Sequence, residues 1–80
     1  MTATMANMKL VYADLLTPSQ LMEGDLINID NDVVEVISIV DDARGDNFII
    51  THRNDFGEEE ETHCTYEDMF KLYVFVDQDY

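Results

Sequence analysis

Residues 24–40 read GDLINIDNDVVEVISIV and decide the fold class. Apolar and polar side chains alternate over Leu26–Asp30, which is the pattern of a strand with one buried face. Asp30–Asn31–Asp32 follows, and these residue types tolerate left-handed backbone, so they predict a tight turn. A run rich in β-branched residues continues over Val33–Val40. The stretch therefore predicts two strands joined by a short turn.

The second of these strands is not expected to be regular. Glu35 and Ser38 cannot both face solvent under strict alternation, so we expect a bulge or a strong bend between them. The turn at Thr65–Asp68 is expected to be a single capped 3₁₀ turn. Three further strands are expected at 47–53, 58–64 and 69–76, with turns at 41–46, 54–57 and 65–68.

The segment before this run allows two interpretations. Residues 1–8 are expected to be a flexible terminus. A short strand over Lys9–Tyr12, with a turn at Ala13–Asp14, competes with a helix whose apolar residues recur at spacings of three or four. Thr17 and Pro18 have the residue types of a helix cap and a first helical position, so they predict one short helical turn. The apolar set of the competing helix is Met5, Met8, Tyr12 and Leu15.

Strand and turn lengths decide the architecture. Strands of about five to eight residues with turns every eight to twelve predict an antiparallel sandwich or barrel. The 80 residues accommodate one domain, and the expected strands would leave two open edges unless the sheet rolled up. We therefore expect an all-β, five-stranded antiparallel barrel with one or two short helical turns, over residues 9–76, followed by an acidic tail at 77–80.

This layout resembles the small SH3-like barrels, including the KOW-type modules of translation and transcription factors. The matching stretches are Leu21–Ile27, the Asp-rich turn, Val33–Val36 and the short turn before the final strand. A similar layout occurs in small acidic proteins of uncharacterised function from bacteria and their phages. The resemblance implies a fold but no binding residues. The chain lacks the basic loops of KOW-type modules and has no tryptophan for a proline-peptide groove.

Composition excludes several classes of function. Four Lys and Arg residues oppose 18 Asp and Glu residues, a formal net charge of −14. So few basic residues do not offset phosphate repulsion, and direct nucleic-acid binding is not expected. One cysteine excludes an internal disulfide framework, and no apolar run reaches the roughly 18 residues of a membrane span. The basic residues are Lys9, Arg44, Arg53 and Lys71.

A short chain also leaves little room for a substrate pocket beside its core. We therefore expect no enzymatic activity, no cofactor and no metal. The expected partner is another protein with a basic surface, and the expected location is the cytoplasm.

The run Glu58–Glu61 is the most distinctive feature of the sequence. On an extended strand its carboxylates would stand about 3.3 Å apart in rise, against one phosphate per about 3.4 Å on a DNA strand. Together with nearby acidic residues, the run would imitate a nucleic-acid backbone and occupy the basic groove of another protein. The predicted binding residues are Asp41, Asp42, Asp46, Asp55, Glu58, Glu59, Glu60 and Glu61.

These residues predict a non-catalytic protein-binding module, in its sharper form a phage-encoded nucleic-acid-mimic inhibitor acting in the host cytoplasm. The alternative is that the carboxylates only keep the protein in solution and protect an edge strand from aggregation.

The strand expected at 69–76 has apolar residues on both faces. One face would fill the core, which leaves Tyr73 and Phe75 to be explained. Either they pack under the N-terminal segment in a small cluster with Leu10 and Tyr12, or they lie exposed as an interface. In the second case the protein would be a structural or assembly module that forms a homodimer through an edge strand.

His52, His63 and Cys64 have the side chains of a zinc site or of a Cys–His nucleophilic pair. His63 and Cys64 are adjacent and point to opposite faces of a strand, so neither site is expected. We instead expect Cys64 to be a small buried core residue.

Overall fold

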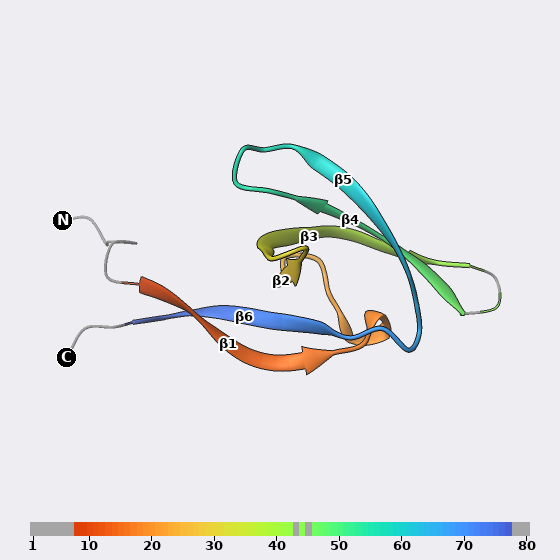
Figure 1. Cartoon of the computed structure of the whole chain (residues 1–80), viewed down its shortest axis with the longest axis horizontal. Coiled ribbons are helices and arrows are strands. Elements are labelled where there is room, and N and C mark those ends of the chain that lie inside the picture. Colours follow the sequence, from red (N-terminus) through yellow and green to blue (C-terminus); the bar gives the residue numbers. More distant parts are fainter. Residues whose placement is uncertain (1–7, 43, 45, 78–80) are drawn as a thin grey trace.

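The computed structural model describes residues 8–42, 44 and 46–77, and its strands form one antiparallel sheet (Figure 1). The sheet has six strands in the order β1-β6-β2-β3-β4-β5. One 3₁₀ turn, η2 (Pro18–Gln20), lies between β1 and β2. The all-β prediction is therefore confirmed. The strands are β1 (Met8–Leu16), β2 (Leu26–Ile29), β3 (Asp32–Asp41), β4 (Asn47–Arg53), β5 (Glu59–Thr65) and β6 (Phe70–Asp77).

The five-stranded SH3-like barrel is not confirmed, because the sheet has six strands and stays open. β1 pairs with β6 along its length, from Met8 opposite Asp77 to Leu16 opposite Phe70. It therefore covers the edge of β6 that would have to meet β5 if the sheet were to close. β1 and β5 are left at the two ends of the strand order.

The N-terminal segment is a strand, so the competing helix is wrong for the described residues 8–16. The turn expected at Ala13–Asp14 is also wrong. The register of β1 shifts between Tyr12 and Asp14, and the strand continues through this irregularity to Leu16. Met5 and the rest of residues 1–7 lie outside the described residues, as do 78–80 of the expected tail.

The hairpin between β2 and β3 has the predicted turn. Asp30 (φ 54°) and Asn31 (φ 70°) both adopt left-handed backbone, as a two-residue hairpin loop requires. The predicted bulge is present as well, because the register of β3 against β4 shifts between Val36 and Ser38. Both features are local, and the sequence alone was enough to place them.

The two predicted helical turns have different outcomes. The Thr17 backbone N–H donates to Gln20 Oε1 (2.9 Å), and Pro18 begins η2 as predicted. At Thr65–Asp68 the Asp68 N–H donates to the Thr65 carbonyl (3.1 Å), which makes a hydrogen-bonded turn and not a 3₁₀ helix.

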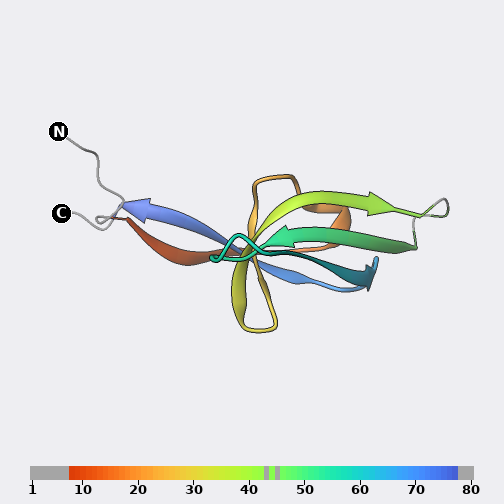
Figure 2. The same ribbon diagram turned by 90° about the horizontal axis from the view of Figure 1, so that it is seen from above.

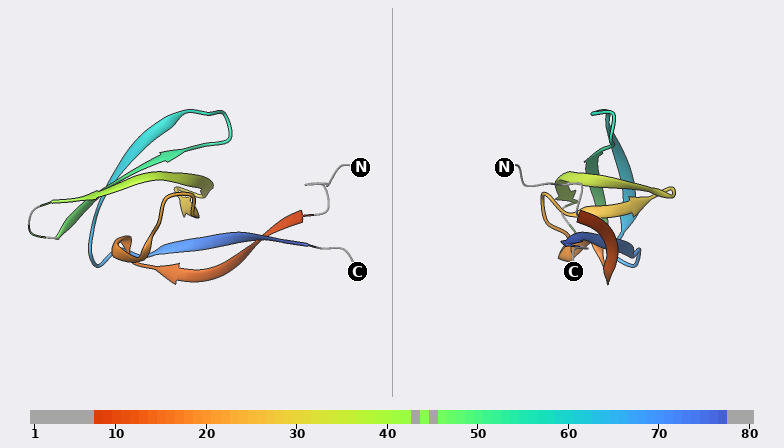
Figure 3. Two further views of the ribbon diagram at one scale, coloured as in Figure 1. Left: turned by 180° about the vertical axis from the view of Figure 1, so that it is seen from behind. Right: turned by 90° about the vertical axis from the view of Figure 1, so that its left-hand side faces the viewer.

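The core lies where the sheet folds over itself. The β1–β6 pair forms one layer and β3–β4–β5 the other, with β2 joining them (Figures 1 and 3). Phe70 and Leu72 of β6 pack against the buried cluster, and so does Leu16 of β1. Cys64 is buried, as predicted. The buried cluster is Leu21, Ile27, Val34, Val36, Phe48, Ile50 and Cys64.

Part of the β1–β6 pair extends beyond this core. β2 pairs with β6 at Leu72 and Tyr73, and within the described residues β1 is the strand that pairs with β6 along Val74–Asp77. We call this two-stranded ribbon, Met8–Val11 with Val74–Asp77, the arm. It projects from the end of the molecule opposite the β3–β4 turn (Figure 2), which gives the chain extents of 49 × 24 × 21 Å.

Candidate functional site

One row of paired residues crosses all six strands of the sheet. Residues directly opposite each other on neighbouring strands project to the same face. The row therefore changes along its length from aromatic, through aliphatic, to charged side chains. Its members, in order across the sheet, are Tyr12, Tyr73, Leu26, Glu35, Arg53 and Glu59.

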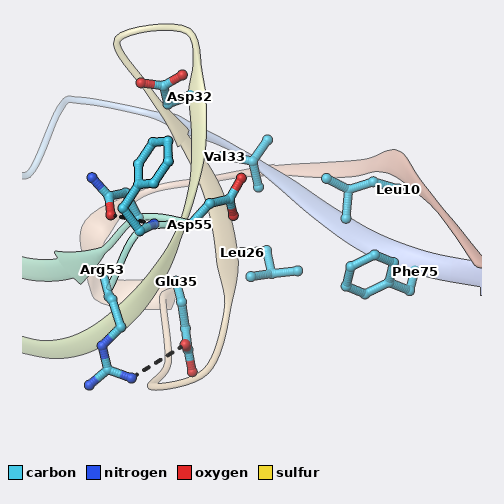
Figure 4. A pocket seen from close by; sticks show the side chains of 10 residues that line it. Leu10, Leu26, Asp32, Val33, Glu35, Arg53, Asp55 and Phe75 are labelled. Atoms are coloured by element: carbon cyan, nitrogen blue, oxygen red, sulfur yellow. Dashed lines mark hydrogen bonds and ion pairs between the residues drawn. The ribbon is translucent and has the colours of Figure 1, made fainter. Parts of the chain in front are cut away.

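A groove of about 440 Å³ includes three members of this row, Leu26, Glu35 and Arg53, and lies between the arm, the β2–β3 hairpin and the β4–β5 turn. In Figure 4 Leu10 and Phe75 lie on one side of the hollow, the charged side chains of Glu35, Arg53 and Asp55 lie on the other, and Leu26 and Val33 lie between them. Its lining comes from the arm, the β2–β3 hairpin and the end of β4 with the turn that follows, so the groove depends on the placement of the arm relative to the rest of the sheet. We call this site the acidic groove. It is lined by Leu10, Leu26, Asp32, Val33, Glu35, Arg53, Asn54, Asp55, Phe56 and Phe75.

The charge of the groove is strongly unbalanced. Arg53 Nη2 lies 2.9 Å from Glu59 Oε2, and Arg53 Nη1 lies 4.0 Å from Glu35 Oε1. The hydrogen bond that Arg53 donates to Glu59 is the main cause that raises the pKa of Arg53 above its ordinary value. One guanidinium is thus shared by two carboxylates. Asp32 and Asp55 form no ion pair within the described part of the chain, so the rim keeps an excess of negative charge.

The turn from β4 to β5 holds one wall of the groove in place. Asn54 Oδ1 accepts from the backbone N–H groups of Phe56 (2.9 Å) and Glu58 (3.0 Å), and Asn54 Nδ2 donates to Glu58 Oε1 (2.9 Å). Gly57 has φ +81°, a left-handed conformation that glycine adopts without steric cost. These bonds present Phe56 to solvent with 87% of its surface exposed.

The structure divides the eight predicted acidic residues between two ends of the sheet. Asp55 lies on the groove, and Glu58–Glu61 continue from it along β5. Asp41 and Asp46 lie at the other end of β4, a seven-residue strand about 20 Å long. There the Tyr66 N–H donates to the Asp46 carbonyl (3.1 Å), which brings the β5–β6 turn alongside. Asp42 shares that far end, where its carboxylate accepts from the Arg44 and Asp46 N–H groups.

The Glu58–Glu61 run does not form a single row of carboxylates. Glu60 lies opposite the buried His52, while Glu59 and Glu61 lie opposite Arg53 and Thr51 on the other face of the sheet. Glu61 Oε1 is also 4.0 Å from His63 Nε2. All four glutamates are exposed. Since β5 is an edge strand, they also discourage another strand from pairing there.

Tyr73 and Phe75 have features of both arrangements that the sequence allowed, a cluster with the N-terminal segment and an exposed interface. Tyr73 packs edge-on against Tyr12, with ring centroids 6.2 Å apart and planes at 70°. Phe75 pairs opposite Leu10. The cluster with the N-terminal segment therefore forms, but it stays open: Tyr12 is 56% exposed and Phe75 is 47% exposed.

The candidate metal and nucleophile residues do not converge. His52 is buried, and its Nε2 lies 2.8 Å from Thr62 Oγ1. Cys64 is buried, and burial, with a smaller effect from the Asp68 charge, raises the pKa of its thiol. His63 is exposed on the other face of β5. Within residues 8–42, 44 and 46–77, no three His, Cys, Asp or Glu side chains gather as a metal site.

Sequence reasoning missed most of the groove, including Asp32, Glu35 and Arg53. The only local signal was Phe56, a large apolar side chain in a turn that is otherwise polar. The other lining residues read as ordinary strand positions, because their proximity depends on how the arm packs.

No family model, no curated protein and no solved structure matches this chain. Among the described residues, no helix has the length and hydropathy needed to cross a bilayer.

Proposed function

We propose that this protein is a non-catalytic binding module that holds a basic region of another protein. The observation that carries the proposal is the acidic groove, where an apolar floor adjoins carboxylates in excess over one shared arginine. Apolar lining favours binding by desolvation, and an uncompensated negative rim attracts lysine and arginine and repels acidic partners. The carboxylates of Glu58–Glu61 extend the negative surface along β5.

Nucleic-acid mimicry is a narrower form of this proposal. Its support is the five of the eight predicted residues that stay together, Asp55 with Glu58–Glu61. The separation of Asp41, Asp42 and Asp46 from these five restricts the proposed mimic to one end of the sheet. Inhibition of a host enzyme by a phage-encoded protein is the biological setting that we propose for it.

Two further features support these proposals. The strand order β6-β2-β3-β4-β5 within the sheet is compatible with an open variant of the SH3-like arrangement, to which β1 adds a sixth strand. Burial raises the pKa of the Cys64 thiol, which makes it a poor nucleophile and argues against a Cys–His nucleophilic pair.

The test is binding to poly-lysine, measured by calorimetry at increasing salt concentration. Affinity should fall steeply with salt, because the attraction is between exposed charges. Reversing Asp32, Asp55 and Glu61 to lysine should abolish binding. The matched control reverses Asp41, Asp46 and Glu67 at the far end, which changes net charge equally and should weaken binding far less. Salt-insensitive binding, or equal loss in both triple variants, would contradict the proposal.

Self-association through β1 is a second candidate function, which the charge distribution along the edges favours. Lys9 and Asp14 are the only charged residues of β1, so two such edges can pair without opposing carboxylates. Tyr12 and Phe75 add exposed apolar surface beside that edge. Light scattering should then show a dimer that Phe75→Ser dissociates and Met22→Ser, at a 69% exposed position, does not. A monomer at high protein concentration would exclude this function.

A further inference from the structure

We infer that the acidic groove takes an extended segment of its partner in which a basic residue stands two positions from an apolar residue. This inference rests on the proposed function and specifies its ligand. Three observations carry it: an unpaired stretch of backbone on the arm, an apolar floor, and carboxylates at a defined place on the rim.

The unpaired backbone belongs to β6. The edge of β6 that faces β2 is paired at Leu72 and Tyr73, and within the described residues no strand continues that pairing along Val74–Val76. The chain before β2 turns instead toward β3, where Gly24 donates to the Val36 carbonyl (2.8 Å) and Val36 donates to the Asp25 carbonyl (2.8 Å). Val74–Val76 thus present backbone groups to which an incoming extended segment can pair by strand addition.

The floor of the groove fits an apolar side chain beside that backbone. Leu10 and Phe75 of the arm face Leu26 and Val33 of the β2–β3 hairpin across the hollow (Figure 4). Its volume of about 440 Å³ is in the range of pockets that enclose small ligands, so it suits one or two side chains. A nucleic-acid duplex or a flat protein surface would leave this floor empty.

The carboxylates on the rim determine which charge is favoured in the bound segment near its apolar residue. Asp32, Glu35 and Asp55 lie on the side of the hollow away from the arm. Residues at i and i+2 of an extended segment face the same way and are about 6.6 Å apart. An apolar residue on the floor therefore places the residue two positions away near the rim, where lysine or arginine is favoured. A second copy of this chain fits poorly, because its net charge is −14.

The experiment uses a synthetic heptapeptide in which two lysines each stand two positions from a central phenylalanine and the other residues are valine. The control peptide has the same composition, with both lysines directly adjacent to the phenylalanine, where they point to the opposite face. Calorimetry on the full chain should show tighter binding of the first peptide. Phe75→Ser and Phe56→Ser should each weaken it about tenfold or more through lost apolar burial. Tyr66→Ser removes an aromatic of comparable exposure (55%) outside the groove and should leave affinity unchanged. Amide exchange at Val74–Val76 should slow when the peptide binds.

Equal affinity for the two peptides, or affinity unaffected by both phenylalanine variants, overturns this inference. Salt-dependent binding of poly-lysine would still support the proposed function in that case. Loss of all salt-dependent binding to lysine-containing probes overturns both. Because Phe56 is an exposed turn residue, its variant keeps the test valid even if Phe75→Ser disturbs the arm.

Discussion

Truncation of Ile27 tests how the arm is attached to the rest of the sheet. Ile27 is fully buried, and it pairs with Val34 of β3 on one side and Leu72 of β6 on the other. β2 is four residues long and makes two register pairs with β6, so this side chain packs where the two layers join. Removing part of it leaves a cavity at the joint, which partial relaxation does not fill.

The magnitude follows from burial. Ile27→Val removes one buried methylene group and should lower the free energy of unfolding by about 0.5–1.5 kcal/mol. For a domain of this size about 1 kcal/mol lowers Tm by roughly 4–8 °C, so the expected drop is roughly 2–12 °C. Ile27→Ala should cost about 2–5 kcal/mol, a large share of the roughly 4–12 kcal/mol available to an 80-residue domain.

The assay is thermal unfolding followed by circular dichroism. Ile29→Val is the matched control, because it removes the same methylene group from the same strand at a position that is only half-buried and lies opposite Asp32. It should lower Tm less than Ile27→Val. An equal or larger drop for Ile29→Val would refute the argument that Ile27 joins the two layers.

Three further predictions concern charge, the thiol and the hairpin turn. Raising salt from about 0.01 M to 0.15 M shortens the Debye length from roughly 30 Å to 8 Å, so screening of the −14 net charge should raise Tm, and a constant Tm would contradict this. Folding raises the pKa of the Cys64 thiol. The contribution of this thiol to the free energy of unfolding should therefore be complete below the ordinary thiol pKa of about 8.5 and decline as the pH rises above it. Urea unfolding should show that the free energy of unfolding falls less between neutral pH and about pH 10 in Cys64→Ala than in the unchanged protein. Equal declines would argue against a contribution from the thiol. At Asn31 (φ 70°), Asn31→Gly should leave the free energy of unfolding unchanged, whereas Asn31→Val should lower it by about 1–2 kcal/mol. Urea unfolding measures both variants, and a valine variant as stable as the glycine variant would exclude a left-handed turn.

The two edges of the sheet have opposite chemistry. β5 carries Glu59, Glu60 and Glu61, which repel a neighbouring strand. β1 carries one lysine and one aspartate, and Tyr12 and Leu15 expose apolar surface beside it. The β1 edge, unlike the β5 edge, can therefore pair with a second copy of the chain, and the arm also borders the groove proposed for a basic segment.

The sequence by itself determined the local structure. The strand at 26–29, the left-handed pair Asp30–Asn31 and the bulge after Val36 all follow from neighbours within a few residues. The separation of the acidic residues was also accessible, because successive turns of an antiparallel meander lie at opposite ends of the sheet. Treating the predicted acidic set as one surface overlooked that rule.

Only the tertiary structure decided the open sheet and the acidic groove. Pairing of β1 with β6 joins residues more than fifty positions apart, and no local pattern selects between that edge and a closed barrel. The groove needs Leu10, Leu26 and Phe75 at one place, which depends on the register of three strands and on the packing of the arm. Such contacts form because long-range apolar burial outweighs the entropy of closing long loops, and this balance belongs to the whole chain.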